Sequence, residues 1–294
     1  MNRPSTRLRR RAAALLLGLC AVAPAVAQDP PPAAPEAPAP AVVPEAPVPH
    51  VAPAPFAPVM RTVGEAVINW TTLTIETRAR SDRTMGAWMD RRVQEQDALD
   101  RVGPSLEALA RAVPVRRDEP VDIILPGDDL LAARLDEGLR AWEVAETRYH
   151  EGGGVEMTAR LNLLRWLSPL LDKKVGPSSE ALPVDGPTGL LIDARGLPFG
   201  PSVVPELRTA DLRVLMSLEM LGKDDGRYAI PVVYVSDPAD PRAAARLGKA
   251  PAFLRPASAE AGVLVVGPSL PLTEPDLALL VAARRIVIVA DPAN

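Results

Sequence analysis

The chain has 294 residues, 37 of them acidic and 33 basic, and its formal net charge is −4. Only 3% of the residues are aromatic, and the chain contains two histidines and one cysteine. Phosphate binding relies on clustered Lys and Arg. The excess of acidic over basic residues therefore argues against a nucleic-acid-binding protein, and we expect no nucleic-acid partner. A single cysteine excludes a disulfide within the chain.

Residues 1–27 have the three parts of a secretory signal peptide. Five arginines come first, an apolar run from Ala12 to Val26 follows, and Ala25-Val26-Ala27 supplies the small residues of a cleavage site. The run is shorter than the roughly 20 apolar residues that span a membrane. Cleavage after Ala27 predicts a protein of the periplasm or cell exterior, in a position to associate with the outer membrane. The mature chain would lack cysteine and carry 28 basic and 37 acidic residues, a net charge of −9.

A lipid anchor at Cys20 is the alternative to that cleavage. Lipoprotein processing requires a small residue before the cysteine, whereas Leu19 stands there. The pattern therefore favours a cleaved signal peptide. Contact with a membrane is expected only through the signal peptide or through such an anchor.

Residues 28–60 predict a disordered Pro/Ala-rich spacer. Proline fixes φ and donates no backbone hydrogen bond, so this segment favours an extended, semi-rigid chain of roughly 3 Å per residue. Two interpretations remain open. The spacer holds a folded body away from a surface, or it is a tail without a role.

Residues 61–172 predict an α+β domain. Glu65–Arg78 predicts one strand, in which the apolar side chains pass from one face to the other midway, as at a bulge. Apolar residues at intervals of three and four predict a helix from Asp82 to about Ala112. Gly103-Pro104 predicts a kink or break in that helix, because proline removes a backbone hydrogen bond.

Further elements complete this domain. Val121–Leu125 is a short strand candidate, and leucines repeating through Leu131–Leu139 predict a helix. Alternating apolar residues predict antiparallel strands at Glu143–Tyr149 and Val155–Leu163, with Gly152–Gly154 in the turn between them. A small sheet with helices on one face is therefore expected.

A Gly-, Pro- and Ser-containing linker at residues 173–187 leads to a second domain, residues 188–294. Its opening stretch, Thr188–Gly196, is a continuous apolar run that ends in a polar turn, which indicates a strand buried on both faces. Leu212–Glu219 and Ala229–Val235 predict a two-stranded ribbon joined by a polar loop.

The last predicted unit is strand, helix, strand. Gly262–Val266 and Ile286–Val289 are apolar strands, and Thr273 has the form of a helix cap between them. Elements of this length predict a right-handed βαβ unit with parallel strands. The predicted fold class is thus α+β and α/β: a helix-on-small-sheet domain, then a mixed-sheet domain ending in a parallel βαβ unit.

Five residues at predicted strand ends are candidates for a crevice that takes a ligand or a partner. They are Asp193, Arg195, Gly196, Ser269 and Asp291. Open α/β sheets bind ligands at the carboxyl ends of their strands. The same residue types also form ordinary strand-ending turns, in which Asp193 and Arg195 would pair locally.

Residues suited to catalysis are scarce. The two histidines are His50, in the spacer, and His150, at a hairpin end. Neither is well placed to serve in a Ser-His-Asp or Cys-His catalytic site, and two histidines are too few ligands for a histidine-based zinc site. No glycine-rich phosphate-loop motif occurs. Paired carboxylates stay open as a hydrolase alternative, but nothing singles out a pair. We expect no catalytic residue, no metal site and no cofactor.

Stretches from both domains are similar to one family. They are Ala66–Thr71, the hairpin Trp142–Leu163, Thr188–Leu197 and Ile286–Val289. The chain resembles bacterial envelope proteins, namely the small surface lipoproteins related to the flagellar assembly protein T. The resemblance implies a non-enzymatic periplasmic or outer-membrane role, with envelope proteins as partners in a ring-like assembly such as the flagellar basal body. The alternative is a periplasmic small-ligand-binding module that uses the crevice near Asp193 and Arg195.

Overall fold

The computed structural model describes five stretches of the chain, all of them after residue 55. The described residues are 56–82, 90–125, 127–172, 186–221 and 230–292. The predicted signal peptide and most of the spacer and linker lie outside these stretches. Val59, at the end of the predicted spacer, is fully buried, so the folded part includes it. No helix among the described residues has the length and hydropathy needed to cross a membrane.

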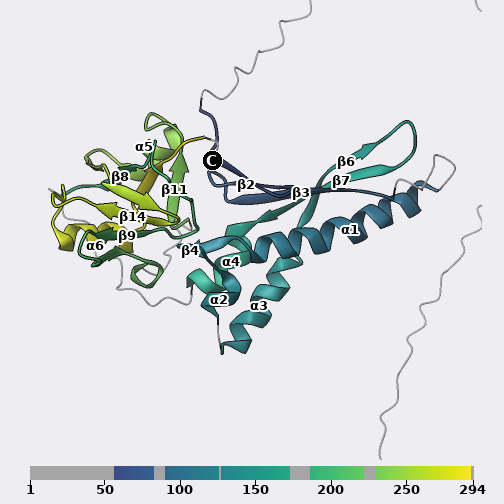
Figure 1. Ribbon diagram of the computed structural model, residues 1–294, viewed down its shortest axis with the longest axis horizontal. Coiled ribbons are helices and arrows are strands. Elements are labelled where there is room, and N and C mark those ends of the chain that lie inside the picture. The colour runs from purple at the N-terminus through teal and green to yellow at the C-terminus, as the bar shows by residue number, and fades with distance from the viewer. Residues whose placement is uncertain (1–55, 83–89, 126, 173–185, 222–229, 293–294) are drawn as a thin grey trace, which may run out of the picture. The chain divides into compact units, whose positions relative to one another are not determined.

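A five-stranded antiparallel sheet forms the first half of the fold, in the order β1-β2-β3-β7-β6 (Figure 1). Its strands are β1 (Met60–Val63), β2 (Ala66–Asn69), β3 (Thr74–Arg80), β7 (Val155–Asn162) and β6 (Glu143–Tyr149). The β6–β7 hairpin confirms the prediction. The single strand predicted over Glu65–Arg78 is wrong, because the chain turns back between Asn69 and Thr74, with Leu73 at a φ of 52°.

Helix α1 (Arg91–Arg111) packs along β3 and β7 (Figure 1). The helix continues through Pro104, so a break there does not occur. Pro104 is exposed, where water can reach the carbonyl group that lost its hydrogen bond. Gly103 faces inward, and a Cβ atom there would lie 2.9 Å from the ring of Trp142. The Gly-Pro pair therefore suits a helix that is packed on one side only.

Later in the sequence than α1 come three short helices and a two-stranded β4–β5 hairpin. They are β4 (Pro114–Arg116), β5 (Glu119–Pro120), α2 (Val121–Ile124), α3 (Asp129–Leu139) and α4 (Leu163–Asp172). The strand predicted at Val121–Leu125 is wrong, because this segment is one helical turn that buries only Val121. The predicted leucine helix is confirmed as α3. It packs against α4, where the Trp166 indole N–H donates to the Leu135 carbonyl oxygen at 3.1 Å.

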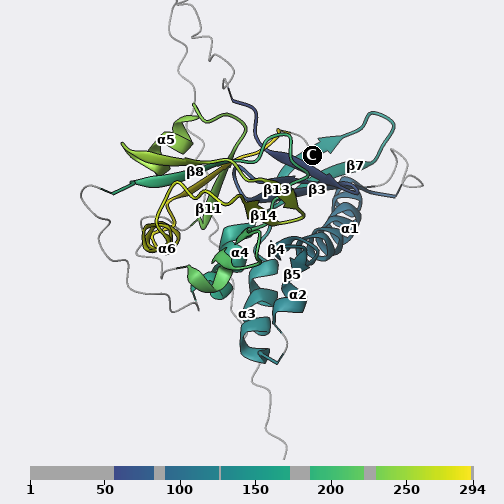
Figure 2. The same ribbon diagram turned by 60° about the vertical axis from the view of Figure 1, so that its left-hand side comes forward.

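A four-stranded parallel sheet lies in the second half, in the order β11-β15-β8-β12. Its strands are β8 (Gly189–Asp193), β11 (Val232–Val235), β12 (Pro251–Leu254) and β15 (Ile286–Val289). The first four residues of β8 are buried, as predicted. Helix α5 (Pro241–Leu247) and helix α6 (Glu274–Ala282) pack on opposite faces (Figure 2). Helix α5 connects β11 to β12, two parallel strands of this sheet, and connections of this kind are almost always right-handed.

A mixed four-stranded sheet, in the order β10-β9-β14-β13, completes the fold. Its strands are β9 (Glu206–Thr209), β10 (Val214–Met216), β13 (Ser258–Glu260) and β14 (Val263–Val266). The predicted ribbon is wrong, because β10 pairs with β9 whereas β11 pairs with β15. The strands β14 and β15 flank α6 as predicted, with Thr273 as its cap, but they belong to different sheets and form no single βαβ unit. An apolar run predicts a strand but not its neighbours.

One hydrophobic core extends through both predicted domains. Trp70, from the turn before β3, meets Tyr234 of β11 edge-on, with 5.9 Å between ring centroids. Backbone bonds add to this contact: Val203 N donates to Pro114 O at 3.1 Å, and Val204 N donates to Val115 O at 2.8 Å. The two halves therefore share both apolar packing and backbone pairing.

Candidate functional site

All four strands of the parallel sheet end at the same edge, called here the carboxyl edge. Polar residues follow each strand there: Ser236 and Asp237 after β11, Asp291 after β15, Asp193 and Arg195 at the end of β8, and Arg255 after β12. The sequence predicted three of these residues. Ser269 follows β14 of the mixed sheet, so the parallel-strand argument that grouped it with the others is wrong for that residue.

Asp193 is the centre of this edge. Its carboxylate accepts hydrogen bonds from the Arg195 backbone N (3.2 Å), Nε (2.9 Å) and Nη2 (2.9 Å). Arg255 Nη1 lies 3.1 Å from its second oxygen. Hydrogen bonds from the Arg195 guanidinium lower the pKa of Asp193, and the charge of Arg255 adds to this effect. Gly196 N donates to Asp291 Oδ2 at 2.9 Å, so four of the five predicted residues gather in one network.

Replacing Asp193 with asparagine should lower the free energy of unfolding by about 1–2 kcal/mol at neutral pH, because charge-assisted hydrogen bonds are lost. The folded-state pKa of Asp193 is depressed, so its stabilisation exists above the unfolded pKa and disappears as the pH falls through the folded value. The difference between the variant and the wild type should therefore begin to shrink below about pH 4 and continue to shrink as the pH falls through the depressed folded-state pKa. Urea titrations at several pH values measure this, and a constant difference down to pH 2 contradicts it.

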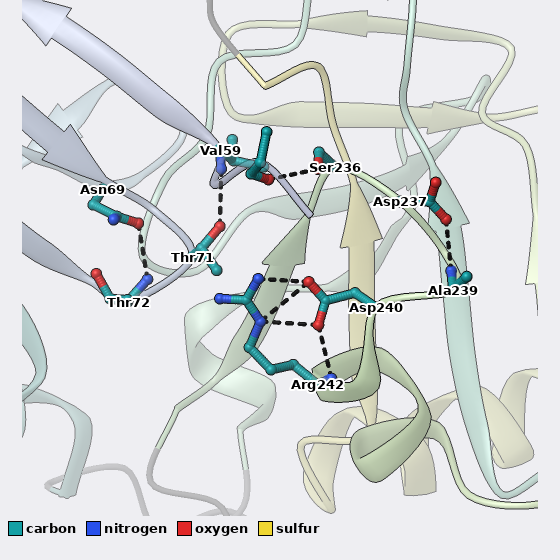
Figure 3. Close-up of polar contacts among 10 residues, drawn as sticks. Val59, Asn69, Thr71, Thr72, Ser236, Asp237, Ala239, Asp240 and Arg242 are labelled. Atoms are coloured by element: carbon teal, nitrogen blue, oxygen red, sulfur yellow. Dashed lines mark hydrogen bonds and ion pairs between the residues drawn. The ribbon is translucent and has the colours of Figure 1, made fainter. Parts of the chain in front are cut away.

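The β11 and β15 ends of the carboxyl edge are bonded to residues 57–60 (Figure 3). Ser236 Oγ donates to the Ala57 carbonyl oxygen at 2.5 Å, and Met60 N donates to Pro292 O at 2.8 Å. Val59 N donates to Thr71 Oγ1 at 2.9 Å, which fixes this segment to the antiparallel sheet.

Next to these contacts, the buried carboxylate of Asp240 caps α5 and accepts from Arg242 N at 2.8 Å. The Arg242 guanidinium also donates to it and lowers the pKa of Asp240 (Figure 3). These groups hold the backbone in place at this half of the edge.

The β8 and β12 ends remain at the surface. The edge strand β12 exposes 64% of Phe253, and the side chain of Arg255 is 56% exposed. Phe253 lies opposite Leu191 in the sheet register, so both occupy the face that carries α5. Arg255 and Asp193 follow two residues later on the same face. Sequence reasoning missed Phe253 and Arg255, because only the strand order places them beside Asp193.

This arrangement suits binding more than proton transfer. Asp193 is held ionised and its oxygens are occupied by arginine donors, which makes it a poor general base. Arg255 Nη2 also donates to the Arg195 carbonyl oxygen at 2.7 Å, so both guanidinium groups are oriented by the fold. An exposed aromatic ring beside oriented arginines is typical of the residues that dominate protein interfaces.

A second feature lies on the mixed sheet. A pocket of about 400 Å³ is lined by residues that include Arg117, Arg208, Leu212, Glu260 and Val265. Beneath it the buried Glu206 accepts from Arg117 Nε at 2.5 Å and from Arg208. Burial and the nearby charge of Arg117 lower the pKa of Arg208. Because Arg117 comes from the β4–β5 hairpin, its ion pair with the buried Glu206 joins the two halves of the fold.

Comparisons with known proteins add no identity to this site. Over the described stretches, no three His, Cys, Asp or Glu side chains are grouped as a metal site. No protein-family model matches the chain, and no curated protein sequence matches it.

Proposed function

We propose that the chain is an exported cell-envelope protein that acts by binding another protein and not by catalysis. The observation behind the proposal is Phe253, which is 64% exposed on the edge strand β12, two residues before Arg255. Burying a phenylalanine side chain contributes about 1.5–3 kcal/mol. The partner expected here has an apolar pocket for the ring, with polar groups at its rim that meet the two guanidinium groups.

Export is supported by the leader at residues 1–27, with its arginines, apolar run and Ala25-Val26-Ala27. The periplasm or the cell exterior is the compartment that we propose. The flagellar-assembly role implied by the resemblance is the narrower form of the same proposal, in which the partner is a component of a ring-like envelope assembly.

Three contacts favour a protein partner over a small ligand at this edge. The Asp193 carboxylate is already occupied by Arg195 and Arg255, and Gly196 N is bonded to Asp291. A small ligand would have to displace these intramolecular bonds to use the same groups. A protein that covers Phe253 can leave them in place.

Replacing Phe253 with alanine should reduce recovery of the envelope partner at least tenfold, because truncating an interface anchor commonly costs about 2 kcal/mol. The measurement is affinity purification of the tagged protein from cross-linked cells, with quantitative mass spectrometry. Leu212→Ala is the matched control, since Leu212 is 72% exposed but follows β9 in the mixed sheet. Equal recovery with both variants and the wild type contradicts the proposal, provided that circular dichroism shows all three folded.

A further inference from the structure

The strand β6 is the outermost strand of the antiparallel sheet in the described part of the chain (Figure 1). Six of its seven residues are exposed. An edge strand of this length presents a row of backbone donors and acceptors to any strand of suitable sequence. Its charged residues are of both signs. A partner strand is therefore stabilised when it places opposite charges across from them.

The outward-facing backbone groups of β6 follow from the hairpin's hydrogen bonds. His150 N donates to Gly154 O at 3.1 Å. The backbone of Val155 is bonded on the other side of β7, to Ser81 N and Ser81 Oγ. Tyr149 lies opposite Val155, and bonded pairs alternate along antiparallel strands. Tyr149 and Thr147 therefore direct their N–H and C=O groups away from β7.

We infer that β6 pairs with β6 of a second copy of this chain, antiparallel and centred on Thr147. In this register the outward N–H and C=O groups of the two Thr147 residues bond to each other. Glu146 of each copy lies opposite Arg148 of the other, and the two antiparallel sheets join into one. Opposite charges directly across a strand pair stabilise it, whereas like charges destabilise it.

Charge complementarity selects this register. Glu146 and Arg148 are about half exposed and already approach each other within the strand, with 2.7 Å between Arg148 Nε and Glu146 Oε1. A pairing centred on Glu146 would place two carboxylates opposite each other. Register is weakly specified on a solvated face by packing alone, so these charges are the groups that can fix it.

The contacts on the other face of β6 support the same pairing. Tyr149 is held by α1: its hydroxyl donates to Glu95 Oε1 at 2.7 Å, and Arg91 lies 5.1 Å from its ring centroid. In the proposed register this fixed ring faces Ala145 of the second copy, the residue at which the pairing of β6 with β7 shifts register. A large side chain then meets a small one, which leaves room for the strands to approach.

Charge reversals test the inference on the full chain secreted by its own leader, with mass measured by sedimentation equilibrium. The wild type should dimerise. Glu146→Arg and Arg148→Glu should each weaken dimerisation at least tenfold, because each places like charges across the pair. An equimolar mixture of the two variants should restore a heterodimer, and the double variant E146R/R148E should dimerise as the wild type does.

Arg160→Glu is the matched control. Arg160 is an exposed, ion-paired arginine on β7, one strand in from the edge, and its change should leave the dimer intact. A monomeric wild type, single variants that dimerise normally, or a mixture that stays monomeric would overturn the inference. The surface is separate from Phe253, so F253A should still dimerise, and each proposal can fail without the other.

Discussion

Replacing Gly189 with alanine should lower the free energy of unfolding by about 3 kcal/mol, as overpacking of a rigid core does. Gly189 begins the central strand β8, where α5 ends directly above it. An added Cβ atom would lie 2.6 Å from Leu247 Cα and 2.7 Å from Leu247 O. Both are backbone atoms, so rotating a side chain cannot relieve the contact.

The surrounding bonds prevent α5 from moving aside. Thr188 Oγ1 donates to Leu247 O at 2.6 Å and accepts from Ala250 N at 2.9 Å. Urea denaturation followed by circular dichroism measures the loss. Gly152→Ala is the control, because a Cβ atom at Gly152 meets nothing within 4 Å. If both variants lose the same stability, close packing of α5 on β8 is not what Gly189 provides.

Replacing Trp70 with alanine should lower the free energy of unfolding by about 3–5 kcal/mol, the range for a buried Trp or Phe. Trp70 is fully buried and meets Tyr234 across the two halves of the fold. Its loss leaves a cavity where the antiparallel sheet joins the parallel sheet. Hydrogen exchange should therefore rise in both halves.

Trp70→Phe separates packing from hydrogen bonding. Within the described residues the Trp70 indole N–H has no hydrogen-bond partner, so phenylalanine removes no bond. It should retain most of the aromatic contact and lose less than half of the stability that alanine loses. A phenylalanine variant as unstable as the alanine variant would show that packing alone does not explain the role of Trp70.

Local patterns were sufficient for several elements. Alternation predicted β7, the leucine spacing predicted α3, and the Thr273 cap predicted the start of α6. Each depends on neighbours within a few residues. The continuous apolar run of β8 also identified the buried strand of the parallel sheet.

Pairing between distant segments was not predictable from these patterns. The strands β14 and β15 are both short apolar runs, and nothing in their composition assigns them to different sheets. The turn within Glu65–Arg78 has no glycine or proline, and Leu73 adopts the positive φ instead. No residue pattern in a single sequence predicts a positive φ at a leucine.

The residues of the candidate site were also predictable only in part. Asp193 and Arg195 are two residues apart, so their pairing could be anticipated as a strand-ending turn. Phe253 and Arg255 join them only because β12 lies beside β8, some 60 residues away in the sequence. Ser269 was placed with them because β14 was expected in the same sheet.

The proposed function requires a protein partner at the exposed β12 edge. A photoreactive phenylalanine analogue at position 253, activated in intact cells, tests it most directly. We expect one discrete cross-linked product between this protein and an envelope protein, and this product should be absent when the analogue replaces Leu212. No product at position 253, or the same product from both positions, would contradict it.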